Sequence, residues 1–235
     1  NKRMNGFFNF NGAEVEAIQL SLEVAIYCTL ISLPIALAIG YGMARSQFFG
    51  KSLIESLLHL PLVLPPVATG YLLLVFLGAK SPFGLYLYDL FGVQLSFRFP
   101  AAVIAAIVVS FPLVVRSIRT SMEMVDPKLE EASRVLGAGK LKTFFKITVP
   151  LAFPGILSGA VLAFARSLGE FGATITFAGN IEGETQTLPL AIYNYMQVPG
   201  SEEPTMRLVL VSLVIAFVAM ALSEWSIKKI KHDNN

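Results

Sequence analysis

The side chains that could do chemistry in this sequence are few, and the clearest group is a short polar segment that begins at Asp126. Asp126 can accept hydrogen bonds from the free N–H groups at a helix start, and Pro127 has no N–H that needs a partner there. Gly137 can take the left-handed backbone that closes a helix. The spacing therefore predicts a short helix between these residues, with one face formed by Leu129, Ala132, Ser133 and Leu136.

This helix needs support from elsewhere, because an isolated helix of about ten residues is marginal in water. Its small apolar face must therefore be covered. The face can pack on the ends of the chain's own helices, or it can insert into a groove on a soluble partner. The residues themselves favour neither alternative.

Chemistry carried out by this chain alone has little support. The run Gly137–Lys140 looks like the end of a phosphate-binding loop, but Arg134 stands where the first glycine of that motif belongs. Leu141 also replaces the serine or threonine that must follow the lysine. Cys28 is the only cysteine and there are two histidines, so no metal site is expected. We predict no catalytic residue and no ATP hydrolysis in this chain.

The composition places these residues in a membrane protein. Of the 235 residues, 54% are hydrophobic and 14% are charged, whereas a soluble domain has about 25% charged residues. A soluble fold of this size would expose large apolar patches. The net charge of +2 is also too balanced for a nucleic-acid-binding protein. Soluble enzymes, nucleic-acid-binding domains and disordered chains are therefore excluded.

Five stretches are long and apolar enough to cross a bilayer, which takes roughly 20 mainly apolar residues. Pro61, Pro65 and Pro66 are expected to kink or break the second of them, because proline lacks the N–H that a helix ladder uses. Residues 83–95 and 171–181 are too short to span. We therefore expect an all-α protein with five transmembrane helices, or six if a short segment also crosses. The five stretches are residues 17–44, 52–78, 100–115, 151–168 and 206–225.

The charges that flank these stretches predict an orientation. The loop between the fourth and fifth stretches is acidic and carries Glu182, Glu184, Glu202 and Glu203. Basic residues are enriched on the cytoplasmic side of membrane proteins, so the N-terminus is expected outside and the C-terminus inside. The chain is interpreted as one transmembrane domain, 1–235, with a cytoplasmic loop at 126–150. Twelve of the 18 basic residues lie on the predicted cytoplasmic side: Arg45, Lys51, Arg116, Arg119, Lys128, Arg134, Lys140, Lys142, Lys146, Lys228, Lys229 and Lys231.

The cytoplasmic loop resembles the EAA loop of the permease subunits of ABC importers. Residues 131–150 read E-A-S-x3-G-x9-I-T-V-P, and only Ser133 and Val149 depart from the family pattern E-A-A-x3-G-x9-I-x-L-P. The resemblance implies a coupling helix that sits in a cleft of an ATP-hydrolysing subunit. The residues implied in this coupling are Glu130, Glu131, Ala132, Ser133, Leu136 and Gly137.

Three further segments, at 59–71, 167–180 and 185–193, are similar to the molybdate permeases of this class. Sulfate/thiosulfate permeases share the run Leu168–Gly172 and are the alternative. Tungstate has nearly the size and charge of molybdate and is an expected second substrate. A channel or secondary oxyanion transporter would have no reason to keep the EAA spacing, and no Ser/His or paired-Asp group within the spans supports an intramembrane enzyme.

The resemblance implies a type I importer fold in a prokaryotic inner membrane. The implied partners are a second copy of the chain, two ATP-binding cassette subunits that use ATP and Mg²⁺, and an external molybdate-binding protein. Hydroxyl groups can donate hydrogen bonds to an oxyanion, although each hydroxyl can instead donate to a backbone carbonyl of its own helix. Arg166 and Glu170 lie four residues apart and can form either a gate or a structural ion pair. The candidate path residues are Thr69, Ser110, Arg166, Ser167, Glu170 and Thr174.

Overall fold

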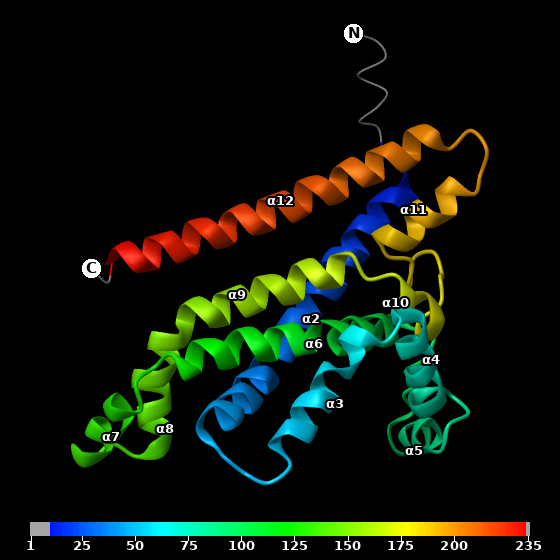
Figure 1. The fold of residues 1–235 in the computed structure, drawn as a ribbon. Coiled ribbons are helices and arrows are strands. Elements are labelled where there is room, and N and C mark those ends of the chain that lie inside the picture. The colour runs from blue at the N-terminus through cyan, green and yellow to red at the C-terminus, as the bar shows by residue number, and fades with distance from the viewer. Residues whose placement is uncertain (1–9, 234–235) are drawn as a thin grey trace.

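The structure is a computed structural model that describes residues 10–233, and within this range it contains helices but no strands. Figure 1 shows the helices crossing one another in an open bundle. The helices are α2 Gly12–Arg45, α3 Lys51–Val63, α4 Pro66–Leu77, α5 Pro82–Phe91, α6 Phe99–Glu123, α7 Pro127–Val135, α8 Lys140–Thr143, the π-helical turn η1 Phe144–Thr148, α9 Val149–Leu168, α10 Gly172–Phe177, α11 Leu188–Met196 and α12 Glu202–Asp233.

The centre of the bundle is formed by α2, α6 and α9, which pack closely on one another. Small residues make this approach possible: a Cβ atom added at Gly155 of α9 would overlap the side chain of Ser121 on α6. The Ser117 hydroxyl on α6 donates to the Gly155 carbonyl at 3.0 Å. Close backbone approach over small residues is how helices associate in lipid, and here it brings α6 and α9 together at Gly155.

The expected break in the second apolar stretch is confirmed. The predicted second span is two helices, α3 and α4, bent by 113°. The bend falls at Leu64 and Pro65, because Pro65 and Pro66 donate no backbone hydrogen bond and a residue before proline avoids helical geometry. A second break follows α9 at Gly169, before the six-residue α10.

These two breaks pack against each other through α4 and α10. A Cβ atom added at Gly70 would lie 2.6 Å from the carbonyl oxygen of Ala173. A Cβ atom added at Gly172 would lie 2.8 Å from the Cβ of Pro66. Two interrupted segments, far apart in the sequence, therefore meet backbone to backbone.

The other predicted spans are confirmed as helices that are longer than expected. The predicted third span ended at residue 115, but α6 continues to Glu123 because its polar end is held by ion pairs. Arg119 lies 2.6 Å from Glu55 of α3 and 2.7 Å from Glu123. Between residues 10 and 233, four helical segments are long and apolar enough to cross a membrane, and the bent pair α3–α4 would make five. The helices α5 and α10 are too short to add a sixth.

The bundle has two ends that differ in what they carry. Figure 1 shows α7, α8 and the end of α12 toward the left, here called the loop end, and the start of α2 with α11 toward the upper right, here called the far end. At the far end, Arg207 of α12 lies 2.8 Å from Glu14 of α2, and both side chains are buried. α12 runs to Asp233, and the side chains of Lys228, Lys229 and Lys231 lie outside the described part.

Candidate functional site

The short polar helix of the loop end is confirmed as α7, with both ends formed as expected. Asp126 accepts a hydrogen bond from the Lys128 N–H at 2.9 Å, and Pro127 is the first helical residue. Gly137 has φ +87°, and its N–H donates to Arg134 at 2.9 Å while that of Ala138 donates to Ser133 at 3.1 Å. These two bonds form a Schellman motif, which a left-handed glycine closes.

The residues expected on the apolar face of α7 are mostly uncovered by the chain itself. Leu129 is half exposed and Leu136 is 87% exposed. Ser133 is the exception, because its hydroxyl lies 3.1 Å from the Thr143 hydroxyl of α8. Val135 and Leu141 are also exposed and add apolar surface that the helical spacing did not indicate.

The two glutamates of α7 have opposite environments. Glu131, which begins the EAA pattern, is exposed, and Glu130 is only 2% exposed. The Glu130 carboxylate accepts from Arg45 Nε at 3.0 Å and from the Thr148 hydroxyl at 2.8 Å. Arg134 lies 3.4 Å away on the other carboxylate oxygen. Glu130 is therefore the residue that attaches α7 to the bundle.

A hydroxyl-bearing cavity of about 700 Å³ opens beside α7. Its polar wall includes Ser117, Thr120 and Ser121 of α6 and Ser158 of α9, and its remaining lining is largely apolar. The sequence analysis did not indicate the three α6 hydroxyls of this wall, those of Ser117, Thr120 and Ser121. Their spacing of three and four residues was the available signal, because it places them on one helical face.

Arg166 and Glu170 form the predicted ion pair, with Nη1 and Oε2 2.8 Å apart. α9 ends at Leu168, so Glu170 reaches back from the turn beyond the helix rather than from a continuous helix. Its other oxygen accepts from the Ala173 N–H at 2.9 Å and so caps the start of α10. Oε2 faces Arg166 without the alignment of a hydrogen bond. The Glu170 carboxylate is 2% exposed and connects the end of α9 to the start of α10 across the second break.

The candidate path hydroxyls differ in whether they have a hydrogen-bond partner. Ser110 is fully buried in the packed interior, where its hydroxyl donates to the Ala106 carbonyl at 2.7 Å, so the expectation that it faces a path is not supported. Thr174 is also buried. Four buried side-chain oxygens of the described residues have no hydrogen-bond partner, and three of them belong to predicted path residues: Thr69 Oγ1, Ser167 Oγ, Glu170 Oε2 and, outside that set, Thr187 Oγ1.

Two solved structures with a similar fold are chains of ABC transporters. A chain of a bacterial alginate ABC transporter, solved with an alginate-bound periplasmic protein, superposes with a TM-score of 0.74 at 17% identity, over 94% of this chain and 80% of that chain. A chain of the MetNI methionine ABC transporter gives 0.66 at 14% identity, over 93% and 94%. At these identities the comparison establishes the fold, as the resemblance predicted.

Closer relatives carry a transport name. The Haemophilus influenzae "Molybdenum transport system permease protein ModB" is 54% identical over 218 residues, which is 93% of this chain and 95% of that protein. The Escherichia coli protein of the same name is 53% identical over 212 residues, 90% and 93% of the two chains. The family profile described as "Binding-protein-dependent transport system inner membrane component" matches residues 34–232. The chain therefore belongs to the family of inner membrane components of binding-protein-dependent transport systems.

Proposed function

We propose that this chain is the membrane-spanning subunit of an ATP-driven importer that carries molybdate, and also tungstate, into the cell. The observation that carries this proposal is the 54% identity to the Haemophilus influenzae molybdenum permease over 93% of the chain. The fold of ABC importer permeases supports the same conclusion. A sulfate/thiosulfate permease is the weaker alternative, because the relatives at high identity carry the molybdenum name.

Two ATP-binding cassette subunits dock on α7 of a permease pair and hydrolyse ATP with Mg²⁺. The uncovered surface of α7 supports this, because Ala132, Val135 and Leu136 are exposed and an isolated apolar face needs a groove to cover it. Glu131 and Gly137 lie at the same surface. The loop end is then cytoplasmic, as are the C-terminus and most basic residues, and the start of α2 is outside.

A second copy of the chain completes the transport path. The close packing of α2, α6 and α9 supports a path that runs between two copies rather than through the centre of one chain. Thr69, Ser167 and Thr174 lie beside it, with Arg166 and Glu170 at the gate. The hydroxyls of Thr69 and Ser167, which make no well-aligned hydrogen bond within the described residues, support this assignment. A buried polar group without a partner costs about 1–3 kcal/mol, so it is expected mainly where a function requires it.

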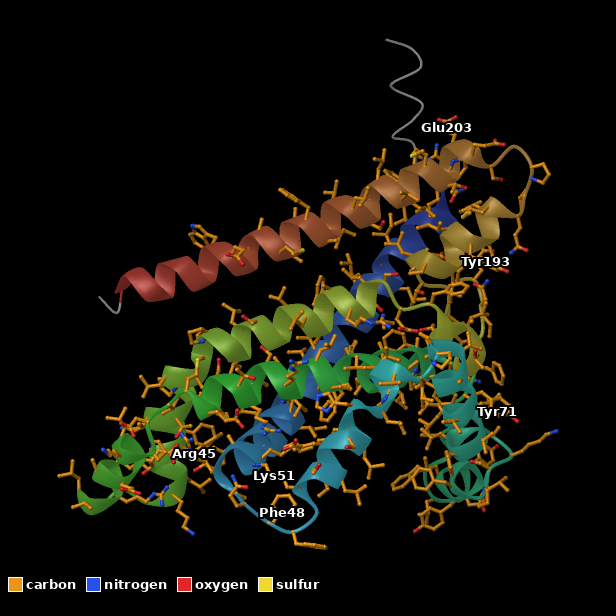
Figure 2. The ribbon with its side chains drawn as sticks, viewed as in Figure 1. Arg45, Phe48, Lys51, Tyr71, Tyr193 and Glu203 are labelled. Carbon is orange, nitrogen blue, oxygen red and sulfur yellow. The ribbon has the colours of Figure 1, made fainter. Side chains whose placement is uncertain are left out.

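An external molybdate-binding protein delivers the ion to the far end. Figure 2 shows Glu203 at this end, on the opposite side of the bundle from Arg45. Glu182, Glu202 and Glu203 are exposed there and form an acidic rim. Charged groups at a rim steer the encounter of two proteins more than they add affinity, so this rim suits transient docking.

Uptake by the assembled importer tests the proposal. The permease, its ATPase and its binding protein are reconstituted in liposomes, and labelled molybdate is supplied with or without unlabelled tungstate or sulfate. We expect ATP-dependent uptake that tungstate suppresses and an equal concentration of sulfate leaves largely unchanged. Equal suppression by sulfate would favour the alternative substrate, and uptake that persists without any ATPase would refute the importer mechanism.

A further inference from the structure

Glu130 is the one buried residue of α7, although it carries a charge. Its exposed fraction is 2%. Removing a carboxylate from water is costly unless opposite charges and hydrogen bonds replace the water. A short surface helix that turns its acidic side chain inward therefore uses that side chain for a specific attachment.

The partners of Glu130 come from the ends of two long helices. Arg45 is the last residue of α2, and its Nε and Nη2 both lie 3.0 Å from Oε1 of Glu130. Thr148 is the last residue of η1, immediately before α9, and its hydroxyl donates to the same oxygen at 2.8 Å. Figure 2 shows Arg45 at the loop end. One carboxylate oxygen thus joins α7 to α2 and to α9.

Arg45 also holds the backbone at the entry to α7. Its Nη2 donates to the carbonyl of Val125 at 2.8 Å, one residue before the helix cap Asp126. The guanidinium therefore engages α7 at two points, through a side chain and through the main chain. Such a forked contact fixes direction as well as distance, which a single ammonium group does not.

The π-helical turn η1 includes Thr148, the residue that attaches Glu130 to the start of α9. It covers Phe144–Thr148 and ends on the residue that donates to Glu130. The ring of Phe144 packs on Tyr41 of α2, with centroids 4.7 Å apart. Single π-helical turns are uncommon and occur often at functional sites. Here the turn lies against the end of α2 and leads directly into α9.

Apolar burial contributes little to holding α7. Val135 and Leu136 are each 87% exposed and Leu129 is 48% exposed. Besides the Glu130 cluster, the side-chain hydrogen bond that joins α7 to its neighbours in the described chain is that of Ser133 with Thr143 of α8. A push or pull on α7 therefore reaches the two long helices through the buried carboxylate.

We propose that Arg45 and Thr148 are positioning residues that act through Glu130 to pass the movement of α7 to α2 and α9. The proposal rests on the proposed function, because it requires an ATPase that moves α7. The cluster converts a displacement at the surface into a displacement of helices that run the length of the bundle. When one contact is lost, α7 stays in place, but the weakened cluster transmits the movement of α7 poorly to α2 and α9.

The test measures the number of ATP molecules hydrolysed per molybdate imported by the complete importer in liposomes. Thr148→Val removes one hydroxyl donor with almost no change in shape. We expect the ratio to rise roughly tenfold, because a hydrogen bond to a charged group is typically worth at least that factor between two conformations. Arg45→Lys keeps the charge but loses the fork, so we expect a smaller rise. In both variants the ATPase subunit stays bound.

Glu55→Gln is the matched control. It breaks another Glu–Arg contact between two helices, that of Glu55 with Arg119, without touching α7, and its ratio should equal that of the unchanged importer. The proposal is overturned if Thr148→Val and Arg45→Lys keep the normal ratio, if they lose the ATPase subunit, or if Glu55→Gln raises the ratio equally. A complete importer without molybdate uptake would instead refute the proposed function, on which this inference depends.

Discussion

A substitution at Gly137 tests the role of the end of α7, because a side chain there would strain the backbone without crowding any neighbour. The φ of Gly137 is +87°, and a Cβ atom added there would meet nothing within 4 Å. A side chain at this residue therefore costs only the left-handed conformation, about 1–2 kcal/mol, and more for a β-branched residue. The two Schellman hydrogen bonds are worth about 0.5–1.5 kcal/mol each. Gly137→Val should consequently open the end of α7.

A cost of one or two kcal/mol changes a conformational population by a factor of about 5–30. We therefore expect Gly137→Val to reduce both the ATPase subunit that co-purifies with the permease and the uptake of molybdate, while the protein still inserts in the membrane. Gly137→Asn should be milder, because asparagine tolerates left-handed geometry.

Gly50→Val is the matched control for this prediction. Gly50 precedes α3, also has φ +87°, and also has open space around an added Cβ atom. The two variants thus carry the same strain at different places. Normal uptake and normal ATPase recovery in Gly137→Val would refute the reasoning. Equal losses in Gly50→Val would also refute it, because the effect would then not depend on α7.

Two further predictions concern the bundle and the path. Gly155→Ala should lower the thermal unfolding midpoint in detergent, because its Cβ overlaps Ser121 and overpacking costs about 1–3 kcal/mol; Gly42→Ala, with open space, should not, and an unchanged midpoint in Gly155→Ala would contradict the close crossing. Thr69→Val and Ser167→Ala should slow molybdate uptake without lowering that midpoint, since neither hydroxyl makes a well-aligned hydrogen bond within the described residues. Undiminished uptake would remove both from the path.

Local signals predicted the parts of the structure that depend on local chemistry. Asp126, Pro127 and Gly137 marked both ends of α7, because a cap is made by residues that are neighbours in the sequence. The prolines marked the break between α3 and α4 for the same reason. The long apolar stretches also became helices, since in lipid each helix must satisfy its own backbone.

Long-range contacts could not be predicted in this way. The resemblance implied Glu130 and Glu131 together in coupling, whereas the structure buries Glu130 alone, against residues 85 and 18 positions away. Ser110 looked equivalent to Thr69 as a candidate hydroxyl, but one bonds to its own helix and the other has no partner. Composition and spacing do not show whether a hydroxyl bonds to its own helix, so they do not separate such pairs.

Four features could be predicted from the residues alone: a membrane protein, its helical spans, the broken second span and the capped loop helix. Each of these follows from hydrophobicity or from hydrogen bonds between neighbouring residues. The meeting of the two broken segments at Gly70 and Gly172 and the link from Glu130 to Arg45 and Thr148 depend instead on how the helices pack. These contacts join residues far apart in the chain, and their geometry arises only when the helices pack.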